Sequence, residues 1–320
     1  MASPTIFALS AFLLGLLFGS FLNVCISRLP THQSIVTPRS HCPHCHHTIR
    51  WYDNIPFLSW HLLRARCRDC KTPISARYPA VELAIALLWA ISAAAILAQW
   101  RCNHVQMPDM CSAAIDTPAF ESLAFYFLRL AILGFLLIGL MVMDWQTLRL
   151  PDAFTLPGIV LGFLLVCAQA AFLAPGQGDI VLNTTHQFRL SSPGSGNALG
   201  NVFLTGTEAL VLGRVAAILG AALILLIARW IYKALRKQEG LGLGDVKLLA
   251  MIAAFLGFPQ SLLALFVGVL SAALYALALL ARRNANRNTR LPLGSFLAAG
   301  GLFSALFGPA ILDWYANLLR

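Results

Sequence analysis

Long apolar stretches alternate with short polar segments along most of the chain. Seven of them are long enough for a helix to cross a bilayer, which takes roughly 20 residues. They cover about residues 4–22, 79–99, 122–143, 153–173, 207–231, 260–281 and 293–316. An eighth, residues 246–258, is shorter, so a re-entrant segment is an alternative there. The pattern predicts an all-α polytopic membrane protein with about eight transmembrane helices in the lipid bilayer.

The composition excludes an ordinary water-soluble domain. Of the 320 residues, 58% are hydrophobic and 11% are charged, and the mean hydropathy is +0.74. The first apolar stretch has no Lys or Arg before it and no A-x-A-like cleavage site. We therefore expect it to stay as a helix rather than to be removed as a signal peptide.

Basic residues gather in alternate loops, which predicts that these loops are cytoplasmic. The loop after the first stretch carries eight of them, and further groups follow the fifth and sixth long stretches, around Lys233 and Arg282. The opposite loops are acidic, so both termini are predicted to be periplasmic. The net charge of +10 is then a topology signal, and no aromatic-interleaved basic pattern indicates a nucleic-acid partner.

Two polar regions divide the chain. Residues 1–24 form the first transmembrane helix, 25–78 a cytoplasmic loop domain, and 79–320 a transmembrane bundle. The bundle contains a polar insertion, about residues 174–206, whose Pro, Gly, Ser and Asn content is typical of a linker on the outer face.

The loop domain contains two C-x-x-C knuckles, Cys42–Cys45 and Cys67–Cys70, at a spacing typical of a four-cysteine zinc site. Four thiolates close the coordination sphere, so the zinc would be structural and would contribute to the folding of a loop too small for much of a core. Redox thiols or disulfides are alternatives, but a reducing cytoplasm and the lack of a thioredoxin-like pattern disfavour them.

Other residues near the knuckles leave further alternatives open. Four histidines near the first knuckle could substitute as ligands: His41, His44, His46 and His47. We expect them to be exposed loop residues instead. Cys102 and Cys111 could pair in an oxidising compartment, which the sequence does not decide. Cys25 and Cys167 are expected to be packing residues.

Two aspartates lie at the ends of apolar stretches on the predicted cytoplasmic side. Asp144 follows the third stretch, and Asp245 precedes the short one. An ionisable group at membrane depth is costly, so each is a candidate functional residue. Carboxylates that approach closely cannot both ionise, so one holds a proton while the other activates water, as in aspartic proteases.

Helix direction suggests which aspartate does what. A helix C-terminus at Asp144 disfavours an anion, whereas a helix N-terminus at Asp245 favours one. We therefore expect Asp144 to hold the proton and Asp245 to act as the base.

Glycines precede Asp245 in GLGLGDVKLLA, residues 240–250. They permit unusual dihedrals and close approach of a peptide strand, although helix packing is an alternative reason for small residues. We favour a role for Gly242 and Gly244 in supporting the substrate, and we assign no role to Lys247.

These residues resemble the type IV prepilin leader peptidases, membrane aspartic proteases with a G-x-G-D motif. The resemblance spans nearly the whole chain. It rests on the two knuckles, GLGLGDVKLLA, GSFLNVCISRLP from Gly19, YPAVELA from Tyr78, and DWQTLRLPDAFTLP from Asp144.

The resemblance implies that Asp144 and Asp245 are the catalytic pair and that the cysteine loop binds zinc. It implies cleavage of the leader of prepilins and type II secretion pseudopilins after a glycine, at the cytoplasmic face of the bacterial inner membrane. It also implies N-methylation of the new amino terminus by S-adenosylmethionine, without identifying the residues that bind this cofactor.

Departures from the family pattern are few. In LPLGSFLAAG, Leu293 and Ser295 differ from the usual residues, and Cys25 replaces a usual valine. We expect all three positions to lie away from the aspartates.

Three other functions stay open: a peptidase without methyltransferase activity, a transporter that uses the paired aspartates, and an inactive scaffold. Transporter sites lie near the bilayer midplane and often occur in repeats, whereas these aspartates lie at one face and no repeat is found. A scaffold needs no carboxylate beside glycines.

Overall fold

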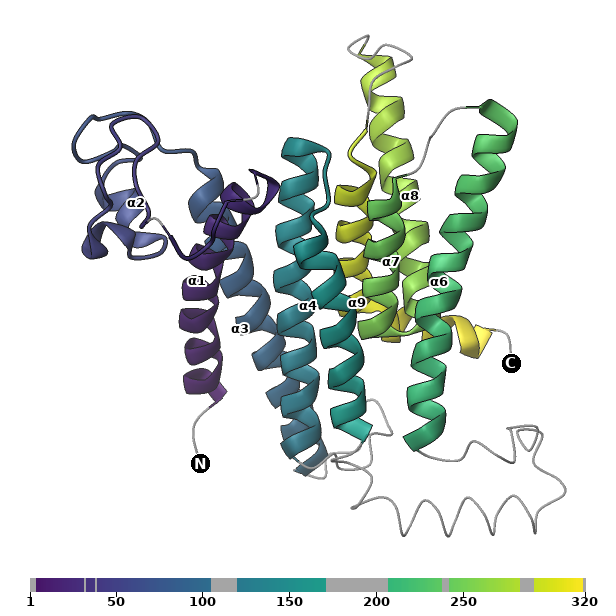
Figure 1. The fold of residues 1–320 in the computed structure, drawn as a ribbon. Helices are drawn as coiled ribbons and strands as arrows, with labels where there is room; N and C mark the ends of the chain where they lie inside the picture. The colour runs from purple at the N-terminus through teal and green to yellow at the C-terminus, as the bar shows by residue number, and fades with distance from the viewer. Residues whose placement is uncertain are drawn as a thin grey trace, which may run out of the picture. The chain divides into compact units, whose positions relative to one another are not determined.

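The structure is a computed structural model that describes residues 4–31, 33–37, 39–104, 120–170, 207–237, 242–282 and 291–318 (Figure 1). Seven helices in these ranges are long and apolar enough to cross a membrane. They are α1 (Pro4–Arg28), α3 (Arg77–His104), α4 (Phe120–Thr147), the helical segment Asp152–Ala170, α6 (Thr207–Arg236), α8 (Phe258–Ala281) and α9 (Leu293–Leu318). The described residues contain two isolated β-bridges but no strand. The predicted all-α membrane fold is confirmed.

The eighth predicted stretch is a helix, α7 (Leu243–Leu256), with 14 residues. Its rise is about 21 Å, less than the about 30 Å of a bilayer's hydrocarbon core. The prediction of about eight transmembrane helices therefore corresponds to seven helices of spanning length and one short helix.

Two features predicted from the sequence fall on residues that the structure does not describe. Cys111 and the whole of the predicted outer-face insertion at 174–206 are outside the described residues. For Cys102 only the backbone is described.

The chain forms two compact units. The first contains Met1–Phe154 and Arg287–Ala299, and the second contains Thr155–Asn286 and Gly300–Arg320. Helix α9 begins in the first unit and continues in the second, so its first turn belongs to the same unit as α4.

In the first unit, α1 packs directly on the backbone of α3. A Cβ atom on Gly15 would lie 2.6 Å from the Ala86 Cα, and one on Gly19 would lie 2.6 Å from the Glu82 Cα. The two glycines form a G-x-x-x-G pattern, which allows membrane helices to approach closely where lipid gives no hydrophobic driving force.

The loop between α1 and α3 carries three short helices, η1 (Leu29–Thr31), η2 (Trp51–Asn54) and α2 (Leu58–Leu62). Arg68 donates two hydrogen bonds to the Asp53 carboxylate, at 2.8 and 2.6 Å, and this contact lowers the pKa of Asp53. The loop is joined to α3 where the Phe57 N–H donates to Glu82 Oε2 at 2.6 Å. The loop thus has its own polar contacts and a fixed attachment to a membrane helix.

In the second unit, α7 packs against α6 and α8, and most of its side chains are buried. It ends because Gly257 has φ +91°, a conformation that other residues rarely adopt. Arg214 of α6 donates from Nη1 to the Ala253 carbonyl at 3.3 Å. The same carbonyl accepts from the Gly257 N–H at 2.9 Å, so the guanidinium adds a second donor, and a positive charge, at the C-terminus of α7.

We predict that Gly15→Ala and Gly19→Ala each destabilise the first unit by about 1–3 kcal/mol, because the added methyl meets the α3 backbone rather than a flexible side chain. Thermal unfolding of the purified protein in detergent measures this effect.

Gly213→Ala is the matched control, since nothing lies within 4 Å of the added Cβ. Equal losses of stability in all three variants would contradict close α1–α3 packing.

Candidate functional site

Asp144 lies in the last turn of α4, and only 5% of it is exposed. Helix α4 ends shortly after it, since Leu148 has φ 52° and its N–H closes the last turn on the Asp144 carbonyl at 2.8 Å. The sequence correctly placed this carboxylate at a helix end, and the structure shows that protein rather than water surrounds it.

The first turn of α9 provides the polar partners of Asp144. The Ser295 N–H donates to Asp144 Oδ2 at 2.7 Å, and the Ser295 Oγ lies 3.1 Å from the same oxygen. A Cβ on the neighbouring Gly294 would lie 3.0 Å from Oδ2, so this position has little room for a side chain. Ser295 was expected to lie away from the aspartates, and that expectation is wrong.

This contact also changes the dipole argument about Asp144. The sequence-based assignment considered only the C-terminus of α4, which disfavours an anion. The structure adds the N-terminus of α9, which favours one, together with two donors from Ser295. Helix direction alone therefore does not identify Asp144 as the proton holder.

Asp245 lies in the first turn of α7 and is 8% exposed. Gly242 is the N-cap of this helix, and a Cβ there would lie 3.4 Å from Asp245 Oδ2. Gly242 has φ −74° and ψ 145°, and Gly244 is helical, so neither adopts the unusual dihedrals that glycine permits. The carboxylate thus lies at a helix N-terminus, as the sequence predicted.

Asp144 belongs to the first unit and Asp245 to the second. Their pairing stays a prediction from the sequence.

The four knuckle cysteines come together in the first unit. The Sγ atoms of Cys42, Cys45, Cys67 and Cys70 all lie within 4.8 Å of one another. Sulfurs in a tetrahedral zinc site, each about 2.3 Å from the ion, are about 3.8 Å apart, and the Cys42–Cys70 distance is 3.8 Å. The sulfur positions therefore fit a metal ion.

Both knuckles use the same turn. In the first, the Cys42 N–H donates to the His47 carbonyl and the His46 N–H donates to the Cys42 carbonyl. Cys67, Thr72 and Lys71 repeat this pattern in the second. His46 and Lys71 each have φ 58°, the left-handed conformation that closes the turn. Each turn directs two sulfurs to one side.

A hydroxyl group and several histidines lie near the four-cysteine cluster. The Thr72 hydroxyl, 3.2 Å from the Cys70 Sγ, lowers the pKa of the Cys70 thiol to about 6. His41, His44, His46 and His47 are all exposed, as expected. His47 could join Cys45 and Asp69 in an alternative ligand group, but this group lacks the closed set of four sulfurs.

The remaining cysteine expectations concern packing. Cys25 is 2% exposed, which confirms that it is a core residue, whereas Cys167 is only partly buried.

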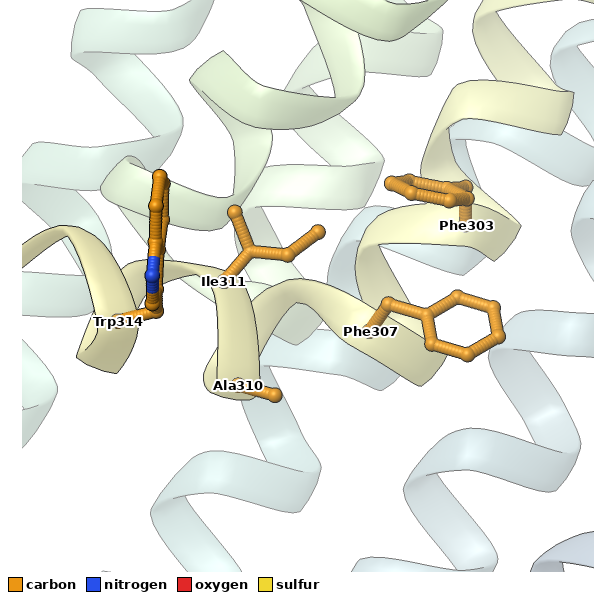
Figure 2. A pocket seen from close by; sticks show the side chains of 5 residues that line it. All are labelled: Phe303, Phe307, Ala310, Ile311 and Trp314. Atoms are coloured by element: carbon orange, nitrogen blue, oxygen red, sulfur yellow. The ribbon is translucent and has the colours of Figure 1, made fainter.

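The C-terminal half of α9 has an apolar groove of about 290 Å³ (Figure 2). Its lining residues follow one face of the helix: Phe303, Phe307, Ala310, Ile311 and Trp314. None of them is ionisable, so the groove has no groups for acid–base chemistry.

Two models of known families match the chain. Residues 13–96 match the model described as "Bacterial Peptidase A24 N-terminal domain", and residues 195–277 match that of the "Type IV leader peptidase family". The first match contains the knuckles and the second contains Asp245. No solved structure matches the chain.

Three curated relatives carry the name "Prepilin leader peptidase/N-methyltransferase". The protein from Aeromonas hydrophila is 32% identical, over 98% of this chain and 94% of its own length. The protein from Burkholderia pseudomallei strain 1026b is 32% identical, over 93% and 84%. The protein from Myxococcus xanthus is 42% identical, over 50% and 40%. Because the first two alignments extend over almost the entire chain, the chain belongs to the prepilin leader peptidase/N-methyltransferase family.

Proposed function

We propose that this chain hydrolyses the leader of prepilins with Asp144 and Asp245 and then methylates the new amino terminus. It is an enzyme of the type IV leader peptidase family. The observation that carries the assignment of residues is the burial of two carboxylates, 5% and 8% exposed, at the ends of apolar helices. Such groups are retained at membrane depth where function requires them.

The proposed hydrolysis needs one protonated and one ionised aspartate. The ionised carboxylate takes a proton from water while the water oxygen forms a bond to the scissile carbonyl carbon. The protonated aspartate gives its proton to the carbonyl oxygen. The tetrahedral intermediate then breaks its C–N bond. The carboxyl group that took the water proton gives it to the leaving nitrogen, and the other aspartate recovers its proton from the hydroxyl group as the carbonyl re-forms. Because the groups interact, the pair titrates as a unit.

The knuckle cluster is proposed to hold zinc. Four cysteine sulfurs favour a soft or borderline metal, and four protein ligands leave no open position for substrate. The ion would therefore fix the loop rather than take part in hydrolysis.

The methyl donor is proposed to be S-adenosylmethionine, which the methyltransferase names of the relatives support. When bound, the sulfonium compound supplies a methyl group to the free amine. Those same names favour a bifunctional enzyme over a peptidase that does not methylate.

The finer assignments rest on the resemblance and on charge. We propose cleavage after a glycine at the cytoplasmic face of the inner membrane, with type II secretion pseudopilins as additional substrates and both termini in the periplasm. The loop between α1 and α3 contains six basic residues, and Arg28 and Arg77 at the flanking helix ends add two more, which supports this orientation. Neither the family models nor the relatives favour a transporter.

We predict that Asp144→Asn and Asp245→Asn each lower the rate of prepilin cleavage on the order of 10³-fold or more, because an amide neither accepts nor carries the required proton. Leader loss in detergent, followed by gel electrophoresis, measures this rate.

Asp313→Asn is the matched control, since Asp313 is an exposed carboxylate on α9. Transfer of labelled methyl to a substrate without its leader tests whether the variants are folded. Cleavage by either dyad variant at the parent's rate would refute the proposed pair.

We predict that the purified protein contains about one zinc ion per chain and that Cys67→Ser loses it, because three thiolates hold the ion less tightly than four. Metal analysis measures the content, and X-ray absorption should give four sulfur neighbours at about 2.3 Å.

Cys25→Ser is the control, since Cys25 is a buried cysteine of α1 outside the cluster. Limited proteolysis should cut the loop domain of the Cys67→Ser protein first. Retention of the metal in that protein would exclude the four-cysteine site.

A further inference from the structure

The hydrogen bonds to the Asp144 carboxylate come from a residue of α9, 151 positions away in the sequence. Ser295 has two donors, its N–H at 2.7 Å and its hydroxyl at 3.1 Å, and both reach Oδ2 of Asp144. In the part of the chain that the structure describes, no hydrogen bond is made to Oδ1. The two oxygens of this carboxylate are therefore not equivalent.

The Ser295 hydroxyl has a choice of acceptors. Its Oγ lies 2.9 Å from the Met141 carbonyl and 3.1 Å from Asp144 Oδ2, and a hydroxyl has one proton to donate. A charged carboxylate attracts that proton more strongly than a neutral carboxyl group does. The hydroxyl can donate to Asp144 when Asp144 is ionised. When Asp144 is protonated, the hydroxyl can donate to the Met141 carbonyl instead.

Other contacts hold the start of α9 against the end of α4 without Ser295. The rings of Trp145 and Phe296 meet edge to face with centroids 6.2 Å apart. A Cβ on Gly294 would lie 2.8 Å from the Leu150 Cδ1, so the backbone of α9 packs directly against the Leu150 side chain. Removal of the Ser295 hydroxyl should therefore leave the helices in place.

We infer that Ser295 is a positioning residue: it holds Oδ2 of Asp144, stabilises the ionised form, and leaves Oδ1 as the oxygen that exchanges protons with water and substrate. This inference rests on the proposed catalytic role of Asp144. It adds a residue that was expected to have no connection with the aspartates.

The test is the pH dependence of kcat/KM for prepilin cleavage in detergent, with three variants. Ser295→Ala keeps the N–H and removes the hydroxyl, Ser295→Pro removes both donors, and Ser295→Thr keeps both. Proline is tolerated in the first turn of a helix, where N–H groups have no partner within the helix.

We expect one limb of the profile to move to higher pH, by about 0.5 unit in Ser295→Ala and about 1–2 units in Ser295→Pro, because the anion loses donors. Ser295→Thr should restore the parent's profile. An acidic limb that moves identifies Asp144 as the base, and an alkaline limb identifies it as the proton holder. Because Ser295 touches no substrate in this scheme, kcat should change more than KM.

Two results would overturn the inference. One is a pH profile of Ser295→Ala and Ser295→Pro that superimposes on the parent's profile, although thermal unfolding shows that both variants are less stable. Ser295 would then only join two helices. The other is an equal shift in Ser295→Thr.

A different result would refute the proposed function itself. If Asp144→Asn cleaves at the parent's rate, Asp144 is not catalytic, whatever the Ser295 variants do. If Asp144→Asn is inactive and the Ser295 variants keep the parent's profile, only the positioning role is lost.

Discussion

A carboxylate at membrane depth needs polar groups of the protein to replace the water it has lost. In this chain the ends of helices provide them. The first turn of α9 directs an N–H and a hydroxyl at Asp144, and Asp245 occupies the first turn of α7. Helix ends are the places in a membrane bundle where backbone donors are free. Around each aspartate, the packing of the helices brings the N-terminus of a helix to a buried position.

The sequence predicted the helices well because hydropathy and length determine which segments can cross a bilayer. It predicted that the four knuckle cysteines come together, because two C-x-x-C pairs at this spacing are typical of a four-cysteine site. It missed the Ser295–Asp144 contact, since no local pattern links residues 151 positions apart. Ser295 was also judged only by its departure from a family pattern, which gives no information about position in space.

Helix boundaries show a further limit of sequence patterns. The apolar stretch at 246–258 has no break in hydropathy near its end, yet α7 stops at Leu256. The cause is Gly257, whose φ of +91° reverses the chain before α8 begins. The G-x-x-x-G pattern of Gly15 and Gly19 was visible in the sequence, but its partner helix, α3, was not. Local sequence thus indicates that a close helix contact is possible, and only the fold identifies the partner helix.

Helix α7 is anchored at the end opposite its aspartate. Arg214 holds the Ala253 carbonyl, and Gly257 turns the chain beside the guanidinium. About 12 Å of continuous helix separates Ala253 from Asp245. Because the buried helix between them is continuous, the position of the Asp245 carboxylate depends on a contact at the other end of α7. Substitutions of Arg214 are therefore expected to act on the proposed catalytic residue without touching it.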